Sequence, residues 1–195
     1  MLKKEQCINS KADLKDWLAV EMARYKSHGI KYFMQVTEGA VLKKHQLLLR
    51  KTEYHHNVGH KFRYLFYRLR LLRLQSKYSL HLPINCFAKG LHLMHVGPIL
   101  VNGNASIGEF CSIHIGTGIV AGGTDDCAPV LGSHVIVGVG AKIVGNVHVA
   151  DGIAIGANAV VTKDFLEPDI AIAGVPAKKI SNNGSRTWNK NRLQG

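Results

Sequence analysis

The sequence predicts a mainly β fold, in which a solenoid of short strands follows an α-helical region. A bulky aliphatic residue recurs at every sixth position from Leu131 to Val161, and the same period runs from Val101 to Ile119. Self-similarity at a fixed period is typical of stacked repeats, and a period of six fits neither an α-helix nor a heptad coil. The first 79 residues, by contrast, have apolar residues at helical spacing. We therefore expect a helical region over 1–79 and a solenoid over 80–166.

The helical region is expected to contain three helices. The first covers 11–28, with Gly29 as a plausible stop, and the others cover about 38–52 and about 59–77. The third carries apolar residues among its basic ones: Phe62, Leu65, Phe66, Leu69 and Leu72. One interpretation packs these apolar residues in the core and leaves the arginines in water. The other makes the helix a surface that meets phosphates, on a ligand or at a membrane.

The repeats predict strands separated by tight corners, with one aliphatic side chain of each strand in a narrow core. The aliphatic residues of this ladder are Val101, Ile107, Ile113, Ile119, Leu131, Val137, Ile143, Val149, Ile155 and Val161. Glycines follow several of them, as expected where backbones approach closely. The rhythm pauses at 121–130, AGGTDDCAPV, which predicts a protruding loop. Residues 167–195 form an exit segment and a basic tail.

Composition limits the kind of protein further. The chain has 195 residues and a formal net charge of +12, which favours an anionic ligand or surface. Its four cysteines are widely spaced and form no CxxC motif. The first twenty residues do not resemble a signal peptide, and no uncharged apolar stretch is long enough to span a bilayer. We expect a cytoplasmic protein.

Candidate chemistry lies where the ladder is irregular. The segment GLHLMHVG, residues 90–97, places His92 and His95 beside glycines ahead of the clean repeats, and His114 directly follows the ladder residue Ile113. Histidine has an ordinary pKa near 6.5 and can take a proton from a hydroxyl at neutral pH. The 121–130 loop is the second irregular place.

Several motifs resemble the hexapeptide-repeat acyltransferases, in particular the serine acetyltransferases and their relatives in polysaccharide gene clusters. In order, they are GLHLMHVGPILVN, IGEFCSI, AGGT, VIVGVGAKIVGNV, IGANAVVTKD and AGVPAKKI. The resemblance covers about 80–180; LLRKTEYHHN at 48–57 is similar to the leader of the polysaccharide-cluster relatives, though less distinctively. It implies a left-handed parallel β-helix, a homotrimer with active sites between neighbouring subunits, and acetyl-CoA as donor.

The resemblance also implies roles for individual residues. The catalytic base of the family falls on His95, which would deprotonate the acceptor hydroxyl. Gly122, Val139 and Ala157 are the candidate contacts for the pantetheine arm of CoA. Lys178 and Lys179 are the candidates for its phosphates.

Three departures from the family bear on the acceptor. Met94 stands where serine acetyltransferases have an Asp, Cys127-Ala128 stands where they have Arg-His, and the carboxylate that orients their histidine aligns near Leu80. Charged groups without partners bind poorly in a buried site. The hypothesis from sequence is therefore an O-acetyltransferase acting on a sugar hydroxyl in surface polysaccharide biosynthesis, with serine as the alternative acceptor.

Other groups are further candidates for the site. Glu53, Asp125 and Asp126 are candidate carboxylates to orient His95, and we expect a site role for Glu53 and for His114 as well. A carbonic-anhydrase-like metal site needs three converging histidines, and the repeats show no such spacing, so no metal is expected. A non-catalytic binder is the other alternative. No nucleic-acid signature accompanies the charge, which leaves peripheral membrane contact through the basic helix.

Overall fold

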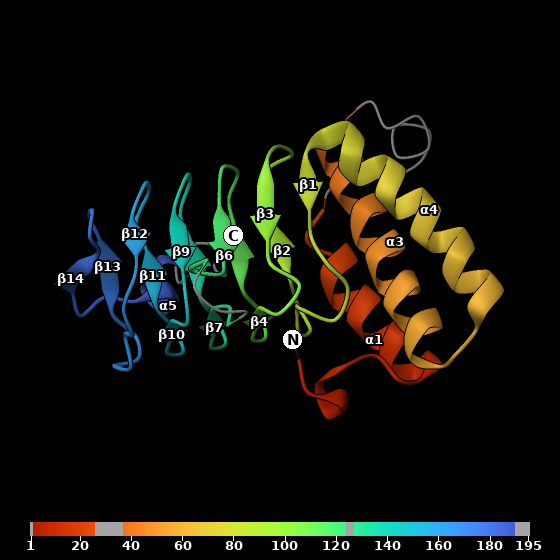
Figure 1. Cartoon of the computed structure of the whole chain (residues 1–195), viewed down its shortest axis with the longest axis horizontal. Coiled ribbons are helices and arrows are strands. Elements are labelled where there is room, and N and C mark those ends of the chain that lie inside the picture. Colours follow the sequence, from red (N-terminus) through yellow and green to blue (C-terminus); the bar gives the residue numbers. More distant parts are fainter. Residues whose placement is uncertain (1, 26–36, 124–126, 190–195) are drawn as a thin grey trace.

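The computed structural model describes residues 2–25, 37–123 and 127–189. A group of helices sits at one end of an elongated, three-sided coil of short strands (Figure 1). The main helices are α1 (Lys11–Met22), α3 (Glu38–Asn57) and α4 (Lys61–Tyr78), preceded by the short helix η1 (Lys4–Gln6). The first helix ends earlier than predicted, and residues 26–28 of that prediction lie outside the described residues. α3 continues five residues beyond the predicted end at 52.

The helix starts follow from capping chemistry. Ser10 and Asp13 form a capping box at α1, in which the Ser10 hydroxyl accepts from the Asp13 N–H and the Asp13 carboxylate accepts from the Ser10 N–H. At α3 the Thr37 hydroxyl accepts from the Ala40 N–H at 3.2 Å. α4 ends at Ser79 in the left-handed conformation, and strand β1 begins at Leu80.

The chain then visits three sheets in rotation, which makes a coil. The strands are β1 (Leu80–His81), β2 (His92–Leu93), β3 (Ile99–Val101), β4 (Ser106–Ile107), β5 (Ser112–Ile113), β6 (Gly118–Val120), β7 (Val130–Leu131), β8 (Ile136–Val137), β9 (Lys142–Val144), β10 (His148–Val149), β11 (Ala154–Ile155), β12 (Val160–Val161), β13 (Ala171–Ala173) and β14 (Lys178–Ser181). The sheet orders are β1-β3-β6-β9-β12, β4-β7-β10 and β2-β5-β8-β11-β13-β14. All pairings are parallel except that of β13 with β14. The short helix α5 (Ser185–Asn189) follows.

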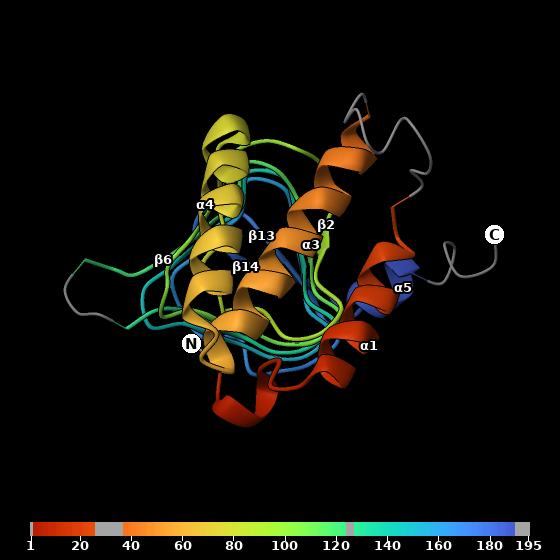
Figure 2. The ribbon, with the colours of Figure 1, turned by 90° about the vertical axis from the view of Figure 1, so that its right-hand side faces the viewer.

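The register confirms the six-residue ladder as the inner row of the coil. Ile113 lies opposite Val137, and Val137 opposite Ile155, all with 0% exposure. Three strands and their corners thus take 18 residues in the later turns of the coil. The turn that contains the 121–130 loop takes six more, and the register resumes after it. Figure 2 shows the successive turns superimposed behind the helices.

Polar side chains of the helices close the open edge of β2. The Glu21 carboxylate on α1 accepts from the Gly90 and Leu91 N–H groups at 3.1 and 3.2 Å. The Gln46 amide on α3 donates to the Leu91 carbonyl at 2.9 Å. The Tyr25 hydroxyl, just after α1, accepts from the Leu93 N–H at 3.0 Å. An unpaired strand edge invites pairing with other chains, so this cover gives the coil a defined beginning.

α4 contradicts one of the two interpretations of its apolar residues, and the phosphate-facing interpretation stays a prediction. Leu71 and Leu74 face the core, whereas the five apolar residues picked out from the sequence are exposed by 39–92%. The interpretation that buries them is wrong, because α4 has a second apolar face and packs with that one. In the described part of the chain no helix is long and apolar enough to cross a membrane.

Candidate active site

His95 meets a carboxylate that sequence reasoning had not assigned to it. His95 lies in the turn after β2, and its Nδ1 is 3.3 Å from Oε2 of Glu38, the first residue of α3. The other oxygen of Glu38 accepts from the Val96 N–H at 2.6 Å. A carboxylate is also favoured at this place by the positive end of the helix dipole. Glu38 is thereby held at two points beside the imidazole.

This contact sets the protonation pattern of the neutral imidazole. An ionised carboxylate only accepts hydrogen bonds, so His95 Nδ1 carries the proton when it donates to Glu38. The lone pair then resides on Nε2, the nitrogen that a general base uses. His95 is 53% exposed, which leaves it accessible to a substrate hydroxyl. The geometry suits proton transfer at neutral pH.

His95 shares one corner of the coil with two predicted CoA contacts. In the β2–β5–β8–β11 register, His95, Val139 and Ala157 each come two residues after a paired ladder residue. The Asn158 N–H donates to the Val139 carbonyl at 2.8 Å, so the corners of successive turns stack directly. Val139 is 44% exposed and Ala157 is also exposed. The structure thus brings these three residues into one exposed column.

The column ends near Lys178, but Lys179 and Gly122 are placed differently. Lys178 lies opposite Ala173 in the β13–β14 pair, and a Cβ built on Gly156 would lie 2.9 Å from that of Ala173. Lys179 on the same strand forms an ion pair with Glu167 at 2.6 Å. Gly122 follows β6 and lies against Gly145 at a different corner. Within one chain, Gly122 is therefore not part of the column.

His92 and His114, the two other histidines singled out from the sequence, differ in position. His114 lies close to His95, with 6.2 Å between the two ring centroids. His92 instead meets the Tyr25 ring at 5.7 Å on the side of the helices. His114 thus adjoins the site, and His92 belongs to the junction with α1.

The expectation that Glu53 orients His95 needs correction. Glu53 is 1% exposed, pairs with Arg50 at 2.8 Å and accepts from the Asn85 N–H at 2.9 Å. Burial raises the pKa of its carboxyl, against the effect of the Arg50 charge. Both oxygens are used within the chain, so Glu53 has a structural role. Asp125 and Asp126 lie outside the described residues.

Lys142 is a second group that the sequence analysis missed. Its ammonium donates to the carbonyls of Gly116 and of Gly140, the latter at 3.0 Å, beside the corner that holds Val139. The signal available in the sequence was a lysine directly before the ladder residue Ile143. A cation so placed adds positive charge next to the column.

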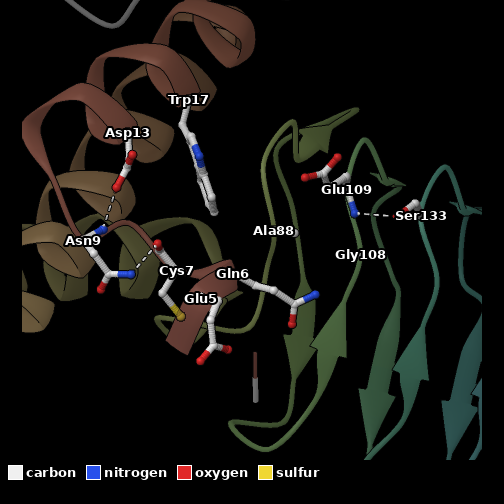
Figure 3. A pocket seen from close by; sticks show the side chains of 10 residues that line it. All are labelled: Glu5, Gln6, Cys7, Asn9, Asp13, Trp17, Ala88, Gly108, Glu109 and Ser133. Carbon is white, nitrogen blue, oxygen red and sulfur yellow. Dashed lines mark hydrogen bonds between the residues drawn. The ribbon is translucent and has the colours of Figure 1, made fainter. Parts of the chain in front are cut away.

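A separate pocket lies between η1, α1 and a corner of the coil (Figure 3). Its lining residues are Glu5, Gln6, Cys7, Asn9, Asp13, Trp17, Ala88, Gly108, Glu109 and Ser133. Three of them are acidic, which opposes the phosphates of CoA. None of the predicted site residues lines this pocket. Among the described residues, no group of three or more His, Cys, Asp or Glu side chains is arranged to hold a metal ion.

Comparisons with known proteins identify the family. No family model matches the chain. It is 34% identical over 129 residues to a serine acetyltransferase of Helicobacter pylori, covering 63% of this chain and 73% of that protein. It is 31% identical over 120 residues to one of Synechococcus elongatus, covering 60% and 48%. It thus spans about half the length of the Synechococcus elongatus relative.

Solved structures agree on the fold. The serine acetyltransferase of Brucella abortus superimposes with a TM-score of 0.66 and 24% identity, over 90% of this chain and 72% of that one. The same protein in complex with coenzyme A gives a TM-score of 0.63, with 88% and 67% covered. Together with the sequence likeness to the Helicobacter pylori relative, this fold places the chain among the hexapeptide-repeat acyltransferases. Within that class, it belongs to the serine acetyltransferase family.

This finding overturns the sugar acceptor expected from the sequence. The relatives described above are serine acetyltransferases, which favours the alternative acceptor, serine, over a polysaccharide. Met94 and Ala128, at positions that are charged in the family, led to the expectation of a sugar. The structure nevertheless supplies a carboxylate beside His95, that of Glu38, which is 57 positions away in the sequence.

Proposed function

We propose that this protein is an acetyl-CoA-dependent serine O-acetyltransferase in which His95 is the general base. The observation that carries the proposal is the contact between His95 Nδ1 and Glu38 at 3.3 Å, at a corner that also presents Val139 and Ala157. The matched relatives and neighbours are serine acetyltransferases, and one solved neighbour is a complex with serine. In this proposal Glu38 is a positioning residue for His95.

The reaction follows from the proton pattern of His95. Nε2 takes the proton of the serine hydroxyl while that oxygen attacks the thioester carbonyl, and Glu38 stabilises the imidazolium that forms. The new C–O bond forms and the C–S bond breaks. The CoA thiolate then takes the proton from Nε2, and His95 returns to its starting state.

The proposal also gives the donor a position along the column of corners. We infer that the pantetheine arm runs from His95 past Val139 and Ala157, with its phosphates toward Lys178. The sheet steps from β2 to β13 span about 19 Å at the usual strand spacing. Gly122, which lies on another corner, would reach the donor only from a neighbouring subunit, as in a homotrimer. The likeness to solved serine acetyltransferases supports a left-handed sense for the coil.

The test measures CoA release from acetyl-CoA with L-serine as acceptor. We expect saturable release, and His95→Asn should lower kcat by about 10²- to 10⁴-fold, the usual contribution of a general base. His148→Asn is the matched control, because His148 is 50% exposed and faces Asp164 at 3.6 Å elsewhere on the coil. Full turnover in His95→Asn would contradict the assignment of the base. No turnover of serine by the wild-type protein, with CoA still bound, would contradict the acceptor.

A further inference from the structure

The outer face of α4 is an apolar stripe that nothing in the described chain covers. Phe62 is 92% exposed, and the four other members of the stripe are exposed by 39–55%. They are Leu65, Phe66, Leu69 and Leu72, and their spacing puts them on one side of the helix, together with Phe62. The inner side, with Leu71 and Leu74, packs in the core. Contiguous exposed apolar surface of this kind marks an interaction site.

Basic side chains border the stripe on both sides. At helical spacing, Arg63, Arg70 and Lys77 form one flank, and Lys61 and Arg68 form the other. Arg73 falls within the stripe itself, toward the end of α4. No Asp or Glu occurs in the sequence between Glu53 and Glu109. None of these six basic residues forms an ion pair with an acidic side chain in the part of the chain that the structure describes.

The neighbouring surface of α3 adds to the positive charge around the stripe. The charges of Arg70 and Lys77 help to lower the pKa of Lys44 on α3, after partial burial as the main cause. Lys51 of α3 lies over the Tyr67 ring, 5.3 Å from its centroid. α4 lies on the outside of the helical end of the molecule (Figures 1 and 2). The positive charge is therefore concentrated on a face that is open to a large partner.

We propose that this face of α4 binds the surface of an anionic lipid membrane. A helix with an apolar side between basic flanks lies in the plane of the interface, with its apolar residues among the acyl chains and its cations at the phosphates. At 18 residues, α4 presents about 27 Å of such surface. A second copy fits less well, because a twofold interface would bring the same uncompensated basic flanks together. Charge complementarity thus selects an anionic partner.

The test is co-sedimentation of the full chain with lipid vesicles. We expect binding to phosphatidylcholine vesicles that contain about 30% phosphatidylglycerol, and weak binding to pure phosphatidylcholine. Phe62→Ser/Phe66→Ser should lower the partition coefficient by at least about tenfold, since two aromatic side chains no longer enter the interface. Arg63→Gln/Arg70→Gln should lower it by about tenfold or more and should weaken its salt dependence.

The matched control is Lys11→Gln/Lys15→Gln, which removes two exposed charges from α1 on the other side of α3. This variant should bind vesicles within about twofold of wild type if local charge at α4 decides. All variants should retain acetyl transfer and their helical circular dichroism. Equal binding to neutral and anionic vesicles, or loss of vesicle binding in the control as large as in the α4 variants, would overturn the proposal. Absence of vesicle binding by the wild-type protein would also overturn it. If the Phe62→Ser/Phe66→Ser variant then also had a lower particle mass than wild type, the face would be assigned to a second copy.

Discussion

Arg50 on α3 and Glu21 on α1 form an ion pair with 2.7 Å between Nη2 and Oε1, and neither side chain is exposed. The guanidinium also donates to the Phe87 and Ala88 carbonyls at 2.9 Å, between β1 and β2 of the coil. Glu21 in turn accepts from the Gly90 and Leu91 N–H groups, directly before β2. The charged pair therefore joins two helices to the coil that they cover.

Removal of Arg50 should destabilise the protein strongly. Arg50→Leu would leave the Glu21 and Glu53 carboxylates buried without their cation, a change that costs about 3–5 kcal/mol in free energy of unfolding. The control is Lys89→Met, which breaks an ion pair with Asp16 that is partly exposed to water and should cost about 1 kcal/mol or less. Urea unfolding of both variants makes the comparison. Equal losses would mean that burial of the Arg50 pair has no special weight.

The corners of the coil provide a second test of the packing. A Cβ built on Gly108 would lie 2.5 Å from the Gly132 carbonyl carbon and 2.6 Å from its oxygen, whereas one built on Gly103 meets nothing within 4 Å. Gly108→Ala should therefore lower the free energy of unfolding by about 1–3 kcal/mol, because the next turn of backbone must move. Gly103→Ala should be neutral or stabilising by up to about 1 kcal/mol. Thermal melts of the two variants decide, and a neutral Gly108→Ala would contradict the stacking described here.

The six-residue ladder is the part of the fold that the sequence alone predicts best. The ladder residues, such as Ile113 and Val137, are identical in kind and equally spaced, so their inward direction and stacking follow from the period alone. The 121–130 loop was also visible as an interruption. What the period cannot supply is the choice between two apolar faces of one helix. Leu71 and Phe62 lie on opposite sides of α4, and only the packing of α3 decides which side is buried.

The site depended on contacts between distant parts of the chain. Glu38 and His95 are 57 positions apart, and no local pattern links the start of α3 to a corner of the coil. From the sequence, Glu53 is a candidate to orient His95 because it is the only carboxylate between Glu38 and Glu109. In the structure, Glu53 lies in the helical cover of the coil, where it forms an ion pair with the buried Arg50. The resemblance predicts His95 as the base, and its contact with Glu38 follows only from the tertiary structure.

His45 should make stability depend on pH. It is fully buried on α3, with Nε2 3.2 Å from the Gln75 amide nitrogen. Burial, with a smaller effect of the Arg50 charge, lowers its pKa from the ordinary 6.5 to about 4. Between these values the unfolded chain binds a proton at this histidine and the native chain does not, so stability falls as the pH falls from about 6.5 to about 4. The loss attributable to His45 is about 3 kcal/mol at most.

Urea unfolding of wild type and His45→Gln over that pH range isolates this contribution. The glutamine does not titrate, so the difference in free energy of unfolding between the two proteins should shrink as the pH falls. A difference that stays constant across the range would show that His45 has the same pKa in both states.

The two lysines of the exit strand should contribute unequally to donor binding. Lys179 is paired with Glu167 at 2.6 Å, whereas Lys178 lies at the end of the column that begins at His95. Lys178→Ala should raise the KM for acetyl-CoA by about fivefold to tenfold, the loss expected for one contact of a charge with a phosphate. Lys179→Ala should change it by about twofold or less, because its charge is already partly neutralised. Steady-state kinetics at saturating serine makes the comparison. A larger rise in KM for Lys179→Ala than for Lys178→Ala would contradict the proposed position of the phosphates at Lys178.

Replacement of Glu38 by glutamine tests whether the carboxylate sets the proton pattern of His95. The amide oxygen of Glu38→Gln can still accept from the Val96 N–H, which keeps the turn in place. Its NH₂ group then faces Nδ1 and favours the imidazole with its proton on Nε2, the nitrogen that must act as base. We expect kcat to fall by about 100-fold or more, with the KM for acetyl-CoA within about twofold of wild type. Nitrogen NMR shifts of His95 should report the change of tautomer directly. Asp164→Asn, at the exposed pair with His148, is the control and should leave kcat unchanged. A Glu38→Gln variant with the wild-type tautomer and full kcat would show that His95 acts without Glu38.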